Sequence, residues 1–462
     1  MALQNFNYMI VRNLDRIIEE HYSNSKNALY LYGARQVGKS YAIRKYAKAH
    51  YPVYLELNFY KDRVLQDLVA TAPSAVEALQ RIALHAHVQL EEGKTFIFFD
   101  EIQKCPEIIT MVKFLVEDGR YRYALSGSLL GVELEGKKKV ESWPVGYMTE
   151  QHVFPLDFKE FILALGVGER IVEMLKDCWE RKVVVDDKVH EEMMKLFHLY
   201  LIVGGMPAPV QTYIDTQDFV QVEERQKEIL DLYRKDIKEY NPGRELQINE
   251  IFDLIPPELN AMNKRFILKD MHDTARFRQY ANDFLWLRQA EMALPTFNSE
   301  LPVAPLKLNE KRNLFKLFQN DVGLLACQYA EGIQLRILKG ETSINYGAIY
   351  ENVVAEELHA HGWNLYYFNS KHQGELDFLL ERDAEVIPLE IKSGKTYERH
   401  NALKNVLKNE EYKIQRALVL CNDNISVEGN ITYAPIYMLM FLHCKQRPKQ
   451  SLYSLKLPDF MK

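Results

Sequence analysis

The N-terminal part of the chain alternates short apolar runs with segments of helical periodicity. Apolar residues recur at helical spacing in 75–83, and 41–48 continues as a helix after a glycine-containing turn. Strands separated by helices favour right-handed crossovers, a parallel sheet covered on both faces, and ligands at the carboxyl ends of the strands. We therefore expect an α/β core over residues 1–155. Its four predicted strands lie at 29–32, 53–57, 96–99 and 123–125.

The strand signal disappears after residue 154, and a helical pattern replaces it. We expect a helical lid over residues 156–240, with helices at 158–165, 171–179 and 190–202.

A second helical block follows the lid. Helical segments at 248–255 and 266–292 end at Pro295. Their helix-turn-helix-turn-helix rhythm, followed by a short apolar stretch, suits a winged helix over residues 241–312. A helical linker is the alternative. Winged helices often serve as connectors, so DNA reading by this block is the less favoured interpretation.

Strand patterns return from residue 317 onward. The sequence therefore predicts a separate α/β domain over residues 313–462, with strands at 363–368, 376–380, 386–391 and 417–420.

Composition supports an ordinary folded protein of several units. The chain has 462 residues, 47% of them hydrophobic and 26% charged, which is too long for one hydrophobic core. The N-terminus lacks the pattern of a signal peptide, and the longest apolar run, 433–444, is too short to span a bilayer. We expect a cytoplasmic protein with no membrane partner.

Cysteine and histidine spacing offers no metal motif. The five cysteines are widely spaced without a CxxC pair, which favours reduced thiols and no zinc site. His359 and His361 are two residues apart on a predicted helix and so do not share a face.

The net charge of -6 is unevenly distributed. Residues 391–462 carry twelve Lys or Arg and six Asp or Glu, so this segment is +6 and the rest of the chain is -12. A basic segment attracts polyanions, although ordinary solvated charge scatter explains it equally well. DNA and a protein both stay open as partners.

A phosphate-binding motif stands between the first predicted strand and the following helix. The run Gly33-Ala34-Arg35-Gln36-Val37-Gly38-Lys39-Ser40 matches GxxxxGK[ST]. In this motif backbone N–H groups and the helix N-terminus converge on the phosphates, Lys39 reaches the β and γ oxygens, and the Ser40 hydroxyl ligates Mg²⁺. We expect this P-loop to bind ATP.

The next buried strand ends in two acids, Asp100 and Glu101. Asp100 is expected to hold the hydrated Mg²⁺, and Glu101 to orient and deprotonate the attacking water, which favours hydrolysis over mere binding. The following strand ends in 126–128, where Ser126 and Ser128 are candidates to sense the γ-phosphate. No NKxD motif follows, so ATP is favoured over GTP.

Nine ordered strings carry a family resemblance: GARQVGKS, FFDEIQ, ALSGSLL, FPLDFKEF, VGGMPAPV, NDVGLL, ENVVAEEL, ELDFLL and PLEIKSGK. Together they resemble the AAA+/STAND-like P-loop ATPases that end in a DUF4143 domain. The resemblance implies a P-loop NTPase parallel sheet, a helical lid, a winged-helix-like segment and a restriction-endonuclease-like C-terminal α/β domain.

The resemblance also bears on two details of the nucleotide site. It implies that the Gly-x-Pro turn ending in Pro207 contacts the adenine base, with a helix-terminating turn as the alternative. Relatives often carry a basic residue where this chain has Tyr147. No arginine finger is therefore evident, and Arg120 and Arg122 are candidates by position only.

A second group of charged residues lies in the C-terminal domain. If the hairpin turn centres on 383–384, residue i pairs with residue 767 minus i, which puts Asp377 opposite Glu390 and Glu375 opposite Lys392 on one face. Facing carboxylates repel each other, and a bound cation relieves this.

The same arrangement is found in PD-(D/E)xK nucleases, where two carboxylates hold Mg²⁺ and a lysine steadies the water. Glu351 resembles the upstream metal-ligating acid of that fold. Solvated charges on an edge hairpin are the alternative, as is a domain that only binds DNA or protein.

These patterns lead to one main hypothesis. The chain is expected to be a slow ATPase, with ATP and Mg²⁺ as cofactors, that acts as a conformational switch coupled to the C-terminal domain. The alternatives are an ATP-gated binding module for DNA or protein without hydrolysis, and an ATP-licensed nuclease with a second Mg²⁺ at Asp377 and Glu390.

Overall fold

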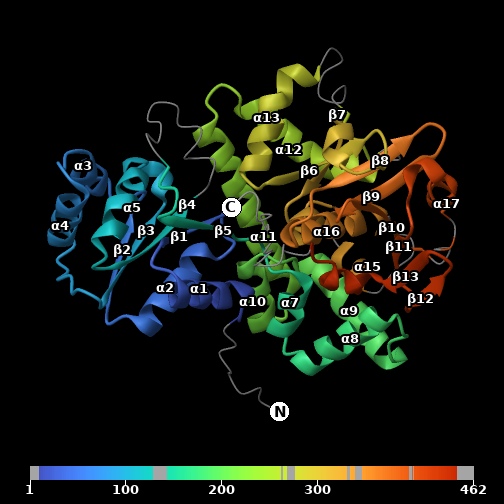
Figure 1. Cartoon of the computed structure of the whole chain (residues 1–462), viewed down its shortest axis with the longest axis horizontal. Helices are drawn as coiled ribbons and strands as arrows, with labels where there is room; N and C mark the ends of the chain where they lie inside the picture. Colours follow the sequence, from blue (N-terminus) through green and yellow to red (C-terminus); the bar gives the residue numbers. More distant parts are fainter. Residues whose placement is uncertain are drawn as a thin grey trace, which may run out of the picture.

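The computed structural model describes residues 10–127, 143–261, 264–267, 276–329, 333–338, 346–394, 398 and 400–444. A five-stranded sheet and an eight-stranded sheet lie at opposite ends of the molecule, and helices fill the space between them (Figure 1).

The first sheet is entirely parallel. Its strands are β1 (Ala28–Tyr32), β2 (Val53–Asn58), β3 (Thr95–Asp100), β4 (Arg122–Gly127) and β5 (Met148–His152), in the order β2-β3-β4-β1-β5. Its helices are α1 (Asn13–Asn24), α2 (Lys39–His50), α3 (Val64–Ala70), α4 (Ala75–His85) and α5 (Glu107–Asp118). The four predicted strands and both predicted helices are confirmed.

Apolar side chains on both faces of this sheet are buried. Tyr30, Ile97 and Leu125 belong to a core beneath α3, α4 and α5, and Leu31 and Phe98 face a second core shared with α1 and α2. Strand β5 was not predicted, because its sequence MTEQH has no apolar run.

The helical region after the first sheet contains α7 (Phe158–Ala164), α8 (Glu169–Arg181), α9 (Asp187–Val203), α10 (Pro207–Thr216) and α11 (Phe219–Tyr240). The first three match the predicted helices. Helix α11 is the longest of the five and runs through the middle of the molecule (Figure 1).

The second helical block differs from the prediction. It contains α12 (Glu245–Asn260) and α13 (Phe277–Gln289), but the expected helix over 266–292 is too long. Residues 266 and 267 are not helical, 268–275 lie outside the described residues, and β6 (Ala293–Ser299) begins two residues after Glu291. Pro295 lies within this strand, where it pairs with Leu317 of β7, whereas the pairing of β6 with β8 covers only residues 297–299.

The second sheet combines strands from both sides of the expected domain boundary. Strand β7 (Glu310–Gln319) contains residues 312 and 313 and pairs with β6, which pairs with β8 (Tyr366–Ser370). Whether α12, α13, β6 and β7 form a winged helix stays a prediction. The other strands are β9 (Gly374–Arg382), β10 (Glu385–Lys392), β11 (Ala417–Cys421), β12 (Ser426–Glu428) and β13 (Ile431–Pro435), in the order β12-β13-β11-β10-β9-β8-β6-β7.

Helices cover both faces of this mixed sheet. Helix α16 (Tyr346–Ala360) contacts β6, β7 and β10, and α17 (Asn401–Lys408) packs over the other face, where Leu403 and Val406 are buried. Two short helices, α14 (Val322–Ala326) and α15 (Ile333–Leu338), contact α9. Short 3-10 turns occur at Ile102–Lys104, Leu306–Asn309, Glu410–Tyr412 and Ile436–Phe441.

The β9–β10 hairpin has the predicted register. Glu385 pairs with Arg382 and Leu389 with Phe378, and both pairs satisfy the expected sum of residue numbers. The turn residues Asp383 and Ala384 have φ of 53° and 62°, as a type I′ turn requires.

One hydrophobic core connects the two sheets. It includes Leu31 of β1, Phe197 of α9, Tyr233 of α11 and Phe378 of β9. Among the described residues, no helix is long and apolar enough to cross a membrane.

Candidate nucleotide site

The P-loop has the strand-loop-helix context that was predicted. It joins β1 to α2, and its backbone has positive φ at Gly33 (143°), Gln36 (66°) and Gly38 (95°). A Cβ on Gly33 would lie 2.2 Å from the Val153 carbonyl oxygen, so no other residue fits there. Gly38 caps the N-terminus of α2, whose positive end faces the loop.

Lys39 spans the loop from inside. Its Nζ donates to the carbonyl oxygens of Gly33 (3.0 Å) and Ala34 (2.7 Å). Burial lowers the pKa of Lys39 to about 8, although Glu101 and Asp100 raise it. The loop therefore holds the Lys39 cation between its own carbonyl oxygens. A cation together with the N-terminus of α2 suits a phosphate group.

Asp100 connects three adjacent segments at the carboxyl end of the sheet. Its Oδ1 accepts hydrogen bonds from the hydroxyls of Ser40 (3.0 Å) and Ser126, and its Oδ2 accepts one from the Asn58 amide (2.7 Å). The predicted residues Ser40, Asp100 and Ser126 are thus brought together. Asn58 was not predicted, although it ends the neighbouring strand directly beside Asp100. Ser128 lies outside the described residues.

Glu101 follows in a left-handed conformation, with φ of 58°. Its carboxylate accepts a hydrogen bond from the amide of Gln103, a buried residue that was not predicted. A non-glycine residue at positive φ costs free energy of about 1 kcal/mol, and such strain is common at functional sites.

Helix α11 contacts the P-loop and the 3-10 turn that follows Glu101. Arg35 Nε lies 2.9 Å from Asp236 Oδ2, and Lys104 Nζ lies 2.8 Å from Glu239 Oε1. Burial raises the pKa of Asp236 to about 6, although Arg35 lowers it. Neither acid was predicted, because helical periodicity alone does not reveal what a charged face contacts.

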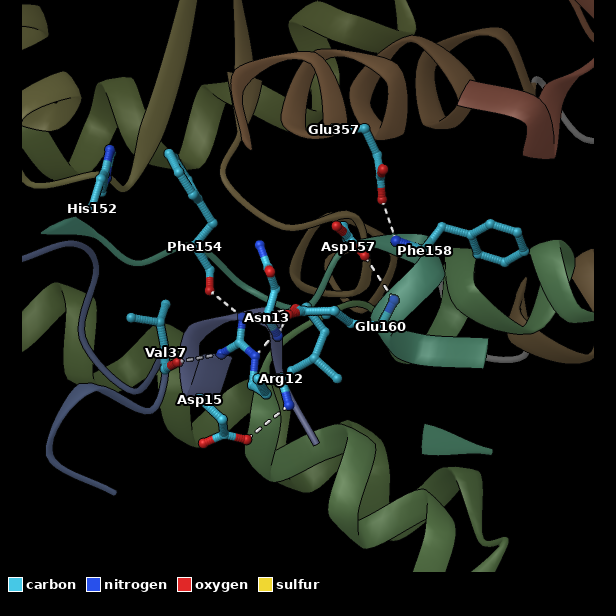
Figure 2. A network of polar contacts seen from close by, with 12 residues as sticks. Arg12, Asn13, Asp15, Val37, His152, Phe154, Asp157, Phe158, Glu160 and Glu357 are labelled. Carbon is cyan, nitrogen blue, oxygen red and sulfur yellow. Dashed lines mark hydrogen bonds and ion pairs between the residues drawn. The ribbon is translucent and has the colours of Figure 1, made fainter. Parts of the chain in front are cut away.

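Pro207 lies beside the loop at the start of α10. A Cβ on Gly38 would lie 3.6 Å from Pro207 Cγ and 3.7 Å from Arg12 Nη1. Arg12 donates to the carbonyl oxygens of Val37 (2.8 Å) and Phe154 (2.9 Å) and pairs with Glu160 (3.0 Å), as Figure 2 shows. Arg12 was not predicted. It ties the end of the P-loop to α7.

The candidate arginine fingers lie away from these contacts. Arg120 pairs with Asp118 at 2.6 Å, and Arg122 begins β4 at the end opposite Ser126. The Tyr147 hydroxyl donates to Glu117 (2.6 Å). The role of Arg120 or Arg122 as an arginine finger stays a prediction that rests on sequence position.

In the C-terminal domain, the predicted acids all have cationic or backbone partners. Lys392 Nζ lies 2.9 Å from Glu390 Oε2, and Asp377 Oδ2 accepts the Ile391 N–H (2.8 Å). Burial and the neighbouring Asp377 raise the pKa of Glu390. The neighbouring Asp377 therefore disfavours ionisation of Glu390, and a metal site at these two residues stays a prediction.

Glu351 lies among lysines. It pairs with Lys264 and, at 3.0 Å, with Lys316, whose fully buried ammonium also pairs with Glu375 at 2.8 Å. Burial opposes ionisation of Glu351, but Lys316 and Lys264 outweigh it and lower its pKa. Sequence reasoning missed both lysines, and the metal-binding role of Glu351 stays a prediction.

Family models match three parts of the chain. The family model described as "AAA domain" matches residues 25–162. Two domains of unknown function, DUF8612 and DUF4143, match residues 194–334 and 346–439. No curated protein matches the chain. The chain therefore carries an AAA-type P-loop ATPase domain, which implies ATP and Mg²⁺, followed by a DUF8612 and a DUF4143 domain.

Two solved structures are similar over most of their length. One is the Walker-type ATPase PABY2304 of Pyrococcus abyssi, with 15% identity and a TM-score of 0.42, covering 69% of this chain and 96% of that chain. The other is the Aeropyrum pernix ORC2 protein in its ADP form, with 11% identity and a TM-score of 0.29, covering 74% and 97%.

Proposed function

We propose that this chain is a slow ATPase whose nucleotide state is transmitted through α11 to the C-terminal domain, as a conformational switch. The observation that carries the proposal is that α11 contacts both the nucleotide site and the end of β7 in the second sheet. Asp236 and Glu239 pair with residues of the nucleotide site, and the Tyr233 hydroxyl accepts a hydrogen bond from Asn320 at the end of β7 (2.9 Å).

The residues of the site fit a magnesium nucleotide. Gly33 and Gly38 allow the positive φ angles of the loop, and Lys39 supplies a cation for the phosphates. Ser40 and Asp100 would hold Mg²⁺, which when bound neutralises charge that develops on the phosphates. Glu101 would accept a proton from the attacking water. Pro207, beside Gly38, would contact the adenine.

The path from α11 continues into buried polar contacts. Gln226 donates to the carbonyl oxygens of Ile202 (2.7 Å) and Val203 (3.0 Å) at the end of α9. The Asp321 carboxylate, next to Asn320, accepts the Gly205 N–H (2.6 Å) and caps α14. A displacement of α11 would therefore disturb the turn that precedes Pro207 and the end of β7 together.

ATP turnover of four variants tests the proposal. Lys39→Ala should abolish binding and turnover. Glu101→Gln should keep binding and lower turnover by about 100-fold or more. Lys48→Ala and Glu92→Gln, both at exposed positions, are the matched controls. Unchanged turnover in Lys39→Ala and Glu101→Gln would defeat the proposal. Absent hydrolysis with nucleotide-dependent binding of DNA or protein would favour the ATP-gated binding module.

Metal-dependent DNA cleavage is the second candidate function, and the hairpin register favours it. The ladder pairs Leu389 with Phe378, and its continuation by one residue would bring Asp377 opposite Glu390. Lys392 already pairs with Glu390 at 2.9 Å. A Mg²⁺ ion held by Asp377 and Glu390 would relieve their repulsion. Because Glu351 is already neutralised by Lys264 and Lys316, it would join the metal only by exchanging one of them.

Plasmid nicking with and without ATP and Mg²⁺ tests this activity. Asp377→Ala should remove nicking while ATP turnover stays intact, and Asp383→Asn in the exposed turn is the control. If no divalent metal supports cleavage, the domain is a scaffold for binding rather than a nuclease.

A further inference from the structure

Three residues from separate parts of the chain meet beside the nucleotide site. His152 ends β5, Glu291 follows α13, and His359 lies near the end of α16. One ligand atom from each can be chosen so that all three lie within 4.8 Å of one another. Among the described residues, this is the one group of three histidine, cysteine or carboxylate side chains with that property.

Each histidine contacts one oxygen of the Glu291 carboxylate at a distance that a shared metal ion also allows, and His359 makes a long hydrogen bond to it. His152 Nε2 lies 3.3 Å from Glu291 Oε1, and His359 Nε2 lies 3.3 Å from Glu291 Oε2. N–H···O hydrogen bonds are usually about 2.7–3.2 Å long. Two ligand atoms bound to one tetrahedral Zn²⁺ at about 2.0–2.1 Å lie about 3.3 Å apart.

The Nε2 atom of His152 is buried, and its contact of 3.3 Å with Glu291 Oε1 does not have the geometry of a hydrogen bond. The imidazole ring is held between Tyr32, with ring centroids 4.7 Å apart, and Phe154, at 3.9 Å. His152 and Phe154 lie at the edge of the Arg12 network (Figure 2). The nitrogen is therefore oriented by packing rather than by a hydrogen bond.

Glu291 presents one carboxylate oxygen to each histidine, Oε1 to His152 and Oε2 to His359. Glu291 and His359 also line a cavity that extends to Phe154, Asn320 and Ala34 of the P-loop. This cavity leaves room for a water molecule or another ligand at a fourth coordination position.

We propose that His152, Glu291 and His359 bind one Zn²⁺ ion. Two histidines and one glutamate are a donor set that Zn²⁺ takes in proteins, with a water as the fourth ligand. The ion connects the edge strand of the ATPase sheet, the α13–β6 junction and α16, so it fastens the ATPase core to the C-terminal domain. A hydrogen-bonded His-Glu-His cluster without metal is the competing arrangement.

Zinc binding by the full chain tests the proposal. After removal of metal, Zn²⁺ is titrated against a chromophoric chelator. The wild-type chain should bind one equivalent, and His152→Ala, Glu291→Gln and His359→Ala should each weaken binding at least tenfold. His372→Ala, at an exposed turn position, should bind as the wild type does. The Co²⁺ complex should have a tetrahedral visible spectrum without a thiolate band, which excludes the five cysteines as ligands.

A stability measurement keeps the test valid if a variant is poorly packed. Saturating Zn²⁺ should raise Tm by about 3 °C in the wild type and in His372→Ala. It should leave Tm unchanged in Glu291→Gln, which retains the shape of the side chain. Equal zinc affinity and equal Tm shifts in the wild type and Glu291→Gln would overturn the proposal, and so would a wild-type chain that binds no zinc.

Discussion

Arg35 of the P-loop forms an ion pair with Asp236 of α11, in which Arg35 Nε lies 2.9 Å from Asp236 Oδ2. The Asp236 side chain is only 7% exposed. The guanidinium lies in the motif that cradles phosphates, so it is within reach of a second anionic partner when nucleotide enters. A change of partner from carboxylate to phosphate would release α11. This exchange gives the proposed switch a physical basis in one ion pair.

Removal of the Asp236 charge should strengthen ATP binding. In Asp236→Asn the carboxylate no longer competes with the phosphates for Arg35, and it no longer repels them. At the effective dielectric constant of a partly buried site, one charge a few ångströms away changes affinity by about tenfold. Calorimetric titration at pH 7.5 measures the change in Kd.

The pH dependence and a control separate this mechanism from a general loss of charge. Because the pKa of Asp236 is raised to about 6, the carboxylate is ionised at pH 7.5 and partly protonated at pH 5.5. The advantage of Asp236→Asn over the wild type should therefore shrink at the lower pH. Asp231→Asn, an exposed change on the same helix, should leave Kd unaltered. An equal gain in both variants would contradict the exchange.

Lys39 should make ATP binding weaken in alkaline solution. Burial lowers its pKa to about 8 in the nucleotide-free protein, and bound phosphates favour the charged form and so raise it. The affinity is therefore full below pH 8 and falls as pH rises through 8. By pH 9 the Kd should increase about tenfold.

Lys39→Arg provides the matched control for this titration. A guanidinium stays charged throughout this range. The arginine variant should bind ATP less well, because its geometry differs, but its Kd should not change between pH 7 and 9. If the wild type and Lys39→Arg lose affinity in parallel, another group is responsible.

Loss of Arg12 should destabilise the whole chain. Its guanidinium is 12% exposed on the side chain and pairs with Glu160, itself 11% exposed. Burial raises the pKa of Glu160 and Arg12 lowers it, so Arg12→Ala leaves a buried carboxylate without its cation. The expected cost is about 3 kcal/mol in the free energy of unfolding, measured by urea denaturation.

Two further variants identify the cause of that loss. Arg12→Ala combined with Glu160→Gln should recover part of the stability, because the uncompensated charge is gone. Arg16→Ala removes an exposed pair with Glu20 and should cost less than about 0.5 kcal/mol. No recovery in the double variant would show that packing, rather than charge, holds Arg12 in place.

The sequence predicted those parts of the site that depend on local patterns. Ser40 and Asp100 follow directly from a motif and from the end of an apolar strand, and the hairpin register follows from a two-residue turn at 383–384. The partners of the site were not predictable in this way. Asp236 contacts Arg35 only because α11 packs across the molecule, and no periodicity encodes that contact.

The partners of the charged residues in the C-terminal domain, and the two histidines near Glu291, were also not predictable from sequence patterns. Like charges on one face of a hairpin suggested a cation, but the sequence could not reveal that the buried Lys316 ammonium already lies between Glu351 and Glu375. His152 of β5 and His359 of α16 come together only in the tertiary structure, where their ring centroids lie 5.7 Å apart. Side chains that meet through tertiary structure leave no spacing to detect.

The β9–β10 turn should become more stable with glycine at position 384. Ala384 has φ of 62° at the second central position of the turn, an exposed site where a side chain is strained and glycine is not. Ala384→Gly should therefore stabilise the fold by about 1 kcal/mol. Ala86→Gly, at the right-handed C-terminus of α4, should instead destabilise it, because glycine gains nothing there and loses entropy on folding. Urea denaturation of both variants checks the pair, and a loss of stability in Ala384→Gly would mean that the turn differs from the one described.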